Sequence, residues 1–471
     1  MAAAQVKQIQ DMMGALLQAW RLRRHDRWTR ADVKRHQQAR LNEIVRHAAR
    51  CSAFYREFYN GLNLDREIDL GALPVVDKAT VMDNFNRLVT DPRLKLSDLE
   101  AHVGRSASDQ EPPANPALTG YRLLSTTGTS GRRGLFVYDR AAWRTVLANT
   151  IRWQLFAGVR PRLPQRLRVC AIGADTALHI SRCLPESGDV GLFRLLVLST
   201  TQPLAELIAA LNDFQPQVLM PYPSIAALLV EAQHAGRLSI DPEVVLPHSE
   251  ALSEEMRRRL TATWNAPVFD HYGLTEEPHV ACECLSHAGL HIFEDLCIVE
   301  VLDEAGKPAP PGRLGARYLL TNLYNRLQPL IRYEVTDMIA VTEAPCSCGR
   351  PFARITRIAG RSEQTLQLRG KHGESVAVPP IAFTCRLDVM PELVEYELHH
   401  DAFGIELQAV ARPGVDREAL RGRLTGELES VVRGLGAVSP AMKVEICDAI
   451  ERRPQQMGKL HSVRASAATA S

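Results

Sequence analysis

Hydrophobic positions recur at helical spacing in the first part of the chain. Four apolar positions between residues 41 and 48 fall three or four residues apart, which predicts one buried helix face. They are Leu41, Ile44, Val45 and Ala48. Upstream, Thr29 followed by Asp32 makes a capping box, the side-chain pattern that starts a helix. The pattern predicts that residues 1 to about 60 are largely helical.

From about residue 140 to 275, short apolar runs alternate with helical patterns. The expected strands are 168–172, 195–198, 217–220, 243–246 and 267–269. The expected helices are 203–214, 224–234 and 253–264. This alternation predicts a mostly parallel sheet covered by helices. In such sheets, ligands bind beyond the carboxyl ends of the strands.

The pattern changes twice after residue 275. Strands and turns dominate 290–345, and a fresh series of strands with one helix follows residue 360. The predicted fold class is therefore α/β: a large N-terminal domain (1–360), with mostly parallel sheets covered by helices and a β-rich subdomain, and a small α+β C-terminal domain (361–464). Residues 465–471 are small and polar, and we expect them to be disordered.

Length and composition agree with two domains and exclude some functions. A chain of 471 residues is too long for one compact core. The net charge is only +2, and no basic run is interleaved with aromatic residues, so nucleic acid is not an expected partner. No stretch of 18 apolar residues predicts a membrane span, and the first residues lack the apolar core of a signal peptide. We therefore expect a cytoplasmic protein.

One short stretch has the chemistry to hold a polyphosphate. Four hydroxyl residues and two glycines occur in six positions, and Arg132 and Arg133 follow at once. The six are Thr126, Thr127, Gly128, Thr129, Ser130 and Gly131. Glycines allow a tight turn whose N–H groups point into one concavity, and the hydroxyls add neutral donors. The spacing is not that of the Walker loop. Taken alone, the stretch is more simply interpreted as a polar surface loop.

Four further motifs follow it in order, at 270–276, 330–337, 358–363 and 457–461. Each is weak alone. All five together, at this spacing, resemble the adenylate-forming superfamily of acyl-CoA synthetases, adenylation domains and luciferases. Arg122 ahead of the loop and the segments 289–295 and 330–333 resemble the phenylacetate–CoA ligase (CapK-like) branch in particular. The resemblance covers nearly the whole chain.

The resemblance implies a nucleotide site. The stretch 126–131 would hold the β- and γ-phosphates of ATP. Ser249 and Glu250 would lie beside adenine, and Tyr272, with Gly273 next to it, along the adenine face. Asp337 would accept hydrogen bonds from both ribose hydroxyls.

The resemblance also implies the reacting groups. Thr275 would bond the α-phosphate and Glu276 would hold Mg²⁺. Lys459, from the small domain, would reach the α-phosphate and the substrate carboxylate. The sequence departs from the family pattern at Arg132 and Arg133, where a Lys-Pro pair is usual, and at the end of the hinge 360–363, where two aspartates are replaced by Glu363 and Gln364.

The activity that the resemblance implies is that of an AMP-forming carboxylate–CoA ligase. A carboxylic acid, aromatic by family likeness, would be adenylated with ATP and passed to coenzyme A. Two alternatives stay open: an adenylating enzyme that passes the acyl group to a carrier-protein thiol or an amine, and a non-catalytic homologue that binds nucleotide or zinc. A homodimer also stays open.

Cysteines and histidines cluster in two places about 60 residues apart. In a cytosolic chain such cysteines are thiols or metal ligands rather than disulfides. The chosen zinc ligands are Cys284, His291, Cys346 and Cys348, with Cys282 or His287 as replacements. Four protein ligands would make the zinc structural, because no position is left open for chemistry. Ordinary buried thiols are the alternative.

Overall fold

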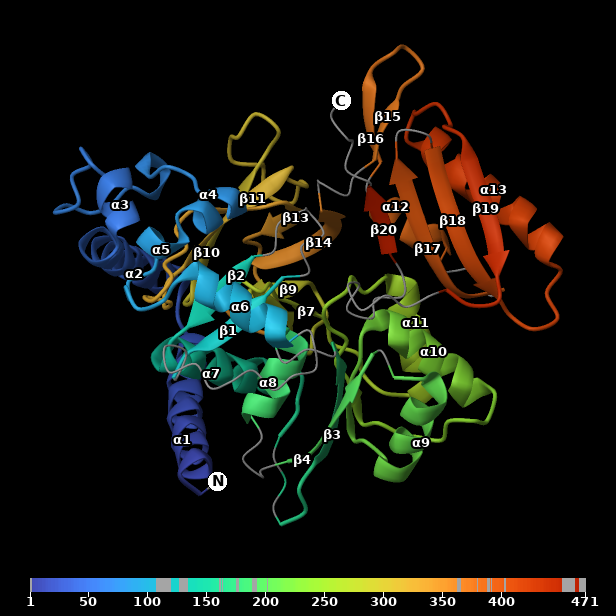
Figure 1. Cartoon of the computed structure of the whole chain (residues 1–471), viewed down its shortest axis with the longest axis horizontal. Coiled ribbons are helices and arrows are strands. Elements are labelled where there is room, and N and C mark those ends of the chain that lie inside the picture. Colours follow the sequence, from blue (N-terminus) through green and yellow to red (C-terminus); the bar gives the residue numbers. More distant parts are fainter. Residues whose placement is uncertain are drawn as a thin grey trace.

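The computed structural model describes most of the chain. The described residues are 2–106, 120–126, 134–160, 162, 164–174, 178–188, 193–200, 202–361, 366–378, 380–387, 390, 392–401, 404–450 and 462–465. Figure 1 shows a large body, coloured blue to yellow, with the small C-terminal part in orange and red next to α10 (Pro223–His234) and α11 (Glu254–Trp264). The architecture is mixed α/β, with one parallel sheet, one mixed sheet in the C-terminal part and several antiparallel ones.

The chain begins with a run of helices, as predicted. They are α1 (Ala2–His25), α2 (Arg30–Cys51), α3 (Ala53–Phe58), the 3₁₀ turn η1 (Leu70–Ala72), α4 (Lys78–Asp83), α5 (Phe85–Leu88) and α6 (Leu96–Ser106). The predicted capping box is confirmed, because the Thr29 side chain accepts from the Asp32 N–H and Asp32 in turn accepts from the Thr29 N–H. The predicted face of α2 is buried.

Two short antiparallel strands flank the glycine-rich stretch. β1 (Arg122–Ser125) pairs with β2 (Leu135–Tyr138), so that Ser125 lies opposite Leu135. Asp139 then caps α7 (Arg140–Phe156) by accepting from the Ala142 N–H. α7 packs against α1 over much of its length.

The predicted parallel sheet is present, in the order β4-β3-β5-β6. Its strands are β3 (Arg168–Gly173), β4 (Arg194–Ser199), β5 (Val218–Met220) and β6 (Val244–Val245). Helices α8 (Ile180–Gly188), α9 (Leu204–Phe214), α10 and α11 accompany it, and Ser253 caps α11. The prediction of a strand at 267–269 was wrong: only a single bridge joins Val268 to Val245. Pro267 has no N–H to extend that ladder.

Two antiparallel sheets complete the large body. One has the order β13-β14-β9-β8-β7 and the other β10-β11-β12. Their strands are β7 (His271–Tyr272), β8 (Ala281–Glu283), β9 (Leu290–Ile292), β10 (Cys297–Leu302), β11 (Arg317–Asn322), β12 (Tyr333–Val335), β13 (Asp337–Thr342) and β14 (Arg354–Arg361). Gly360, in the predicted hinge, has a φ of 92°.

The C-terminal part has a hydrophobic core of its own, formed by residues from Leu366 to Val444. Its elements are β15 (Leu366–Arg369), β16 (Ser375–Val378), α12 (Pro380–Leu387), β17 (Leu393–Asp401), β18 (Gly404–Ala411), α13 (Arg417–Gly434), β19 (Met442–Cys447) and β20 (Ser462–Ala465). The mixed sheet has the order β19-β18-β17-β20. Arg412 follows β18 and forms an ion pair with Glu231 of α10 at 2.5 Å, which joins the two parts.

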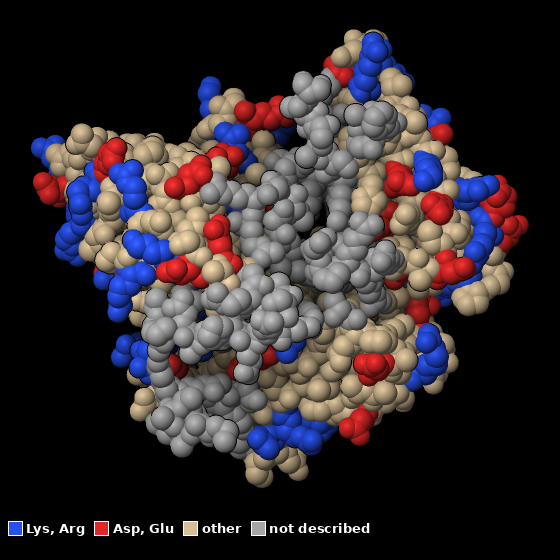
Figure 2. All heavy atoms as spheres, viewed as in Figure 1, with Lys and Arg blue, Asp and Glu red and all other residues tan. Residues whose placement is uncertain are grey.

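The described residues on the face in Figure 2 form no broad region of one charge. On the face in Figure 2, the blue Lys and Arg side chains are interspersed with red Asp and Glu. Among the described residues, no helix is both long and apolar enough to cross a membrane.

Candidate active site

The base of the glycine-rich loop is held closed by Thr126. Its N–H donates to the Gly134 carbonyl at 3.0 Å, and its Oγ1 accepts from the Gly134 N–H at 2.8 Å. Both ends of the loop are therefore fixed on β1 and β2. The other five predicted phosphate-binding residues, Thr127 to Gly131, lie outside the described residues, as do Arg132 and Arg133.

Gly273 lets the chain fold back on itself directly after β7. A Cβ at this position would come within 2.0 Å of the Pro278 carbonyl oxygen, so a side chain cannot be accommodated without moving the backbone. The Leu274 N–H closes the turn by donating to the Glu277 carbonyl at 2.8 Å. This turn carries the two predicted reacting groups, Thr275 and Glu276.

Two tyrosines fix that turn from other parts of the chain. Tyr138, at the end of β2, donates to the carbonyls of Thr275 and Glu276 at 2.8 and 2.9 Å. Tyr333, in β12, donates to the Glu276 carboxylate at 2.8 Å. The strand that leaves the glycine-rich loop thus holds the backbone of the proposed α-phosphate and magnesium residues.

Tyr272 and Asp337 are in direct contact. The Tyr272 hydroxyl donates to the Asp337 carboxylate and lies 3.0 Å from the Tyr318 hydroxyl. Burial raises the pKa of Tyr272 well above its usual value, so the phenol stays a donor at neutral pH. Asp337 is buried at the start of β13. The residues predicted to bind adenine and ribose therefore lie together.

Ser249 and Glu250 lie beyond the carboxyl ends of β5 and β6. Ser249 has a φ of 67°, a left-handed conformation that is uncommon for a residue with a side chain. Glu250 is anchored at the start of α10, where it accepts from the Ser224 N–H at 2.9 Å and from its hydroxyl at 3.0 Å. This is the edge of the parallel sheet at which ligands are expected.

The neighbouring His248 is neutral. Burial lowers its pKa to about 4. Its Nε2 lies 3.1 Å from the Met220 carbonyl, which can only accept, so Nε2 carries the proton. Nδ1 is then the acceptor for the Ser249 hydroxyl at 3.0 Å. The hydrogen bond places the Ser249 side chain.

Sequence reasoning missed Glu277, a buried carboxyl next to Glu276. It accepts from the Tyr324 hydroxyl at 2.9 Å and the Asn322 amide at 2.6 Å. Burial nevertheless raises its pKa to about 8. Its partners are more than 40 residues away in the sequence, so no local signal separates it from Glu276.

The four chosen zinc ligands come together. Their ligand atoms all lie within 4.8 Å of one another. Cys284 Sγ is 3.9 Å from Cys346 Sγ, and His291 Nε2 is 3.3 Å from Cys348 Sγ. Tetrahedral zinc, with bonds of about 2.1–2.3 Å, holds neighbouring ligand atoms roughly 3.5–3.8 Å apart. Burial lowers the pKa of His291 to about 4, which keeps its imidazole neutral and able to bind a metal. The residues present fit a zinc ion.

The two replacement ligands are not part of this cluster. Cys282 is buried in β8. His287 stacks on Phe269 with ring centroids 4.7 Å apart. The structure therefore favours the first choice of ligands over the alternatives.

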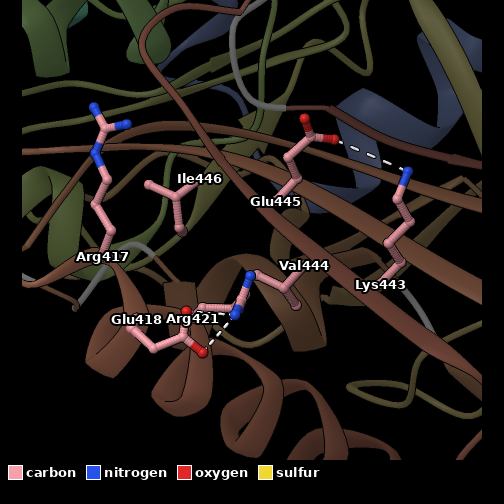
Figure 3. A pocket seen from close by; sticks show the side chains of 7 residues that line it. All are labelled: Arg417, Glu418, Arg421, Lys443, Val444, Glu445 and Ile446. Carbon is pink, nitrogen blue, oxygen red and sulfur yellow. Dashed lines mark hydrogen bonds and ion pairs between the residues drawn. The ribbon is translucent and has the colours of Figure 1, made fainter.

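A separate surface pocket of about 490 Å³ lies on the small domain, between α13 and β19. Figure 3 shows its charged side chains, among which Arg421 pairs with Glu418 and Lys443 lies near Glu445. The charges on its walls are paired within the domain, and none of the predicted site residues lines it. Lys459 lies outside the described residues.

Comparison with known proteins agrees with this arrangement. The structure superposes on the crystal structure of 2-hydroxyisobutyryl-CoA ligase in the post-adenylation state with a TM-score of 0.73, at 20% identity, covering 94% of this chain and 91% of that one. The chain thus has the fold of the adenylate-forming superfamily. No protein-family model matches it.

Two curated proteins narrow the class. The phenylacetate–coenzyme A ligase of Pseudomonas putida is 27% identical over 447 residues, 89% of this chain and 92% of that protein. That of Thermus thermophilus is 26% identical over 376 residues, 76% of each chain. Within the superfamily, the chain is phenylacetate–CoA ligase-like.

Proposed function

We propose that this protein is an AMP-forming carboxylate–CoA ligase. The observation that carries the proposal is the convergence of two motifs, 270–276 and 330–337, that lie far apart in the sequence. Tyr272 contacts Asp337, and Tyr333 contacts Glu276, so the residues assigned to adenine, ribose and magnesium share one site. The similarity to phenylacetate–CoA ligases over most of the chain supports the same reaction.

In the first step, a carboxylate oxygen of the acid attacks the α-phosphorus of ATP. The bond to pyrophosphate breaks, and an acyl adenylate forms. Negative charge builds on the phosphoryl oxygens and on the leaving group, where hydroxyls, backbone N–H groups and cations stabilise it. Thr275 would donate to the α-phosphate, and Lys459 would supply the positive charge.

The two tyrosines that hold the turn give this step its rigidity. Because Tyr138 bonds both carbonyls of Thr275 and Glu276, the backbone is fixed before substrate arrives. Tyr333 holds one carboxylate oxygen of Glu276, and carboxylate oxygen is the ligand that Mg²⁺ prefers. Asp337 would accept from the ribose hydroxyls, which an acceptor-only side chain suits.

In the second step, the thiol of coenzyme A attacks the acyl carbon of the adenylate, and AMP leaves. The small domain would turn about residues 360–363 between the steps, so that Lys459 serves only the first. Gly360, with its positive φ, offers the backbone freedom such a hinge needs.

A zinc ion held by Cys284, His291, Cys346 and Cys348 would be structural. It would link β8 and β9 to the loop after β13. These three strands belong to the same sheet as β7, so the ion would stabilise the sheet that carries Tyr272 and Asp337. With four protein ligands, the ion would stabilise the fold and take no part in the reaction.

The test is the identity of the products. The purified protein is incubated with ATP, Mg²⁺, coenzyme A and a panel of aryl and alkyl carboxylic acids, and the products are analysed by mass spectrometry. We expect AMP and one or more acyl-CoA thioesters, and a large loss of both with Glu276→Gln, which keeps the size of the side chain and removes its charge. Acyl-AMP that never becomes a thioester would move the proposal to another acceptor. Unconsumed ATP with every acid would refute it.

A further inference from the structure

A hydrogen-bonded chain of three side chains runs from α7 to β7. Thr150 Oγ1 lies 2.7 Å from His279 Nε2, and His279 Nδ1 lies 2.8 Å from His271 Nε2. Trp153 stacks on the His271 ring, with centroids 4.8 Å apart and planes 21° apart. Among the described residues, none hydrogen bonds to the remaining ring nitrogen, His271 Nδ1.

Both histidines in this chain are neutral. Burial lowers the pKa of His271 to about 3 and that of His279 well below its usual value. A neutral imidazole has one N–H donor and one acceptor nitrogen, so the state of each ring fixes that of the next. Thr150 also lies 2.9 Å from the Val146 carbonyl, to which its hydroxyl can donate.

The orientation of the Thr150 hydroxyl therefore decides whether His271 Nδ1 is a hydrogen-bond donor or acceptor. If Thr150 donates to Val146, His279 donates to Thr150, His271 donates to His279, and His271 Nδ1 is an acceptor. If Thr150 instead donates to His279, its bond to Val146 is lost, His279 donates to His271, and His271 Nδ1 is a donor. Rotation of one hydroxyl thus lets the site present either role.

His271 lies on the opposite side of β7 from Tyr272, the residue that the proposed function places against the nucleotide. Adjacent side chains of a strand point to opposite faces, so His271 projects away from the Tyr272 hydroxyl that contacts Asp337. The His271 side chain is only partly buried. It lies near His248, which is beyond the carboxyl edge of the parallel sheet and whose imidazole is also neutral.

We propose that His271 Nδ1 recognises a neutral hydroxyl or amino substituent on the acid substrate. The inference rests on the proposed function, because it assigns the acid to the face of β7 opposite the nucleotide. Hydroxyl and amino groups both donate and accept, so they match a nitrogen whose role can switch. An acid with only hydrocarbon in that position would leave the nitrogen unpaired when the acid excludes water.

The experiment compares matched acids in acid-dependent exchange of labelled pyrophosphate into ATP. Each unsubstituted aryl or alkyl acid is paired with its hydroxyl and amino derivatives, and kcat/KM is measured for each. We expect the best substituted acid to exceed its parent by about fivefold, which is what one net hydrogen bond of ordinary strength gives. His271→Phe keeps a ring to stack on Trp153 and should bring the ratio close to one.

Thr150 gives a second, independent test as a positioning residue. Thr150→Val removes the hydroxyl at nearly constant volume and should reduce the preference, mainly through KM of the substituted acid, while Thr150→Ser should restore it. Thermal unfolding shows whether each variant folds. If His271→Phe does not fold, the comparison of Thr150→Val with Thr150→Ser tests the proposal instead. This inference would be overturned if parent and substituted acids had equal kcat/KM, or if folded His271→Phe kept the wild-type preference. Either result would leave the proposed ligase activity standing. No exchange with any acid would remove both.

Discussion

Replacement of Arg152 by methionine should destabilise the protein strongly. Arg152 is fully buried in α7. Its guanidinium donates to both oxygens of Asp295 at 2.9 and 3.0 Å and to Asp26 at 2.5 and 3.0 Å. It also packs over the rings of Phe293 and Phe352. Among the described residues, the Arg152→Met variant leaves the fully buried Asp295 carboxylate with only His25 as an ion-pair partner.

The magnitude follows from the two carboxylates left behind. Breaking a buried ion pair by removing one partner costs about 3–5 kcal/mol, because the other charge stays buried and unpaired. In a domain of this size, that corresponds to a fall in Tm on the order of 5–10 °C. Thermal unfolding followed by circular dichroism at pH 7 measures it.

The matched control is Arg144→Met, on the same helix. Arg144 pairs with Asp11 at 3.5 Å and is 36% exposed, so its loss should cost less than about 1 kcal/mol.

Arg152 holds the pKa of Asp295 below its usual range although burial alone would raise it. This stabilisation is present at neutral pH and is lost as the pH falls and Asp295 is protonated. The gap between wild type and Arg152→Met should therefore narrow in acid. A Tm for Arg152→Met equal to that of Arg144→Met would refute the reasoning.

Three further predictions concern the metal cluster, a buried carboxyl and the small domain. The purified protein should carry about one zinc per chain by elemental analysis. Cys346→Ser should lose the zinc, whereas the control Cys51→Ser, at an exposed thiol, should keep it. Equal zinc content in the two variants would exclude this cluster as the zinc site. The folded-state pKa of Glu277, about 8, lies above its ordinary value of 4.5, so the wild type should lose stability relative to Glu277→Gln as the pH rises between these values; parallel Tm–pH curves would contradict this. Lys459→Ala should abolish adenylate formation but largely spare thioester formation from supplied acyl-AMP, and equal loss of both steps would contradict the two-position model.

The sequence predicted the elements that depend on local pattern. The capping box at Thr29 and the cap at Ser253 are both present, since each is decided within one turn of helix. All four parallel strands were predicted to within one residue at each end, because each is a short apolar run between turn residues. At 267–269 a similar run forms only one bridge, since pairing depends on the neighbouring strand as well as on the segment itself.

The site was predictable in its motifs but not in its contacts. Tyr272, Glu276 and Asp337 were chosen because they stand in short motifs of fixed order. Tyr138 and Tyr318 were missed, because their hydrogen-bond partners in the site, Glu276 and Tyr272, lie 138 and 46 residues away in the sequence. For the metal cluster, the spacing of cysteines and histidines left six candidate ligands. Cys282 lies within β8, whereas Cys284 follows the last residue of that strand and its thiol lies near Cys346. The sequence does not show where the strand ends.

The central claim is that the site joins a carboxylic acid to AMP. Exchange of labelled pyrophosphate into ATP measures that step alone, without any thiol acceptor. We predict exchange that requires both Mg²⁺ and a carboxylic acid, and that falls sharply in Asp337→Asn, which removes the proposed ribose acceptor. Exchange that is independent of any acid, or absent with every acid of a broad panel, would contradict the account.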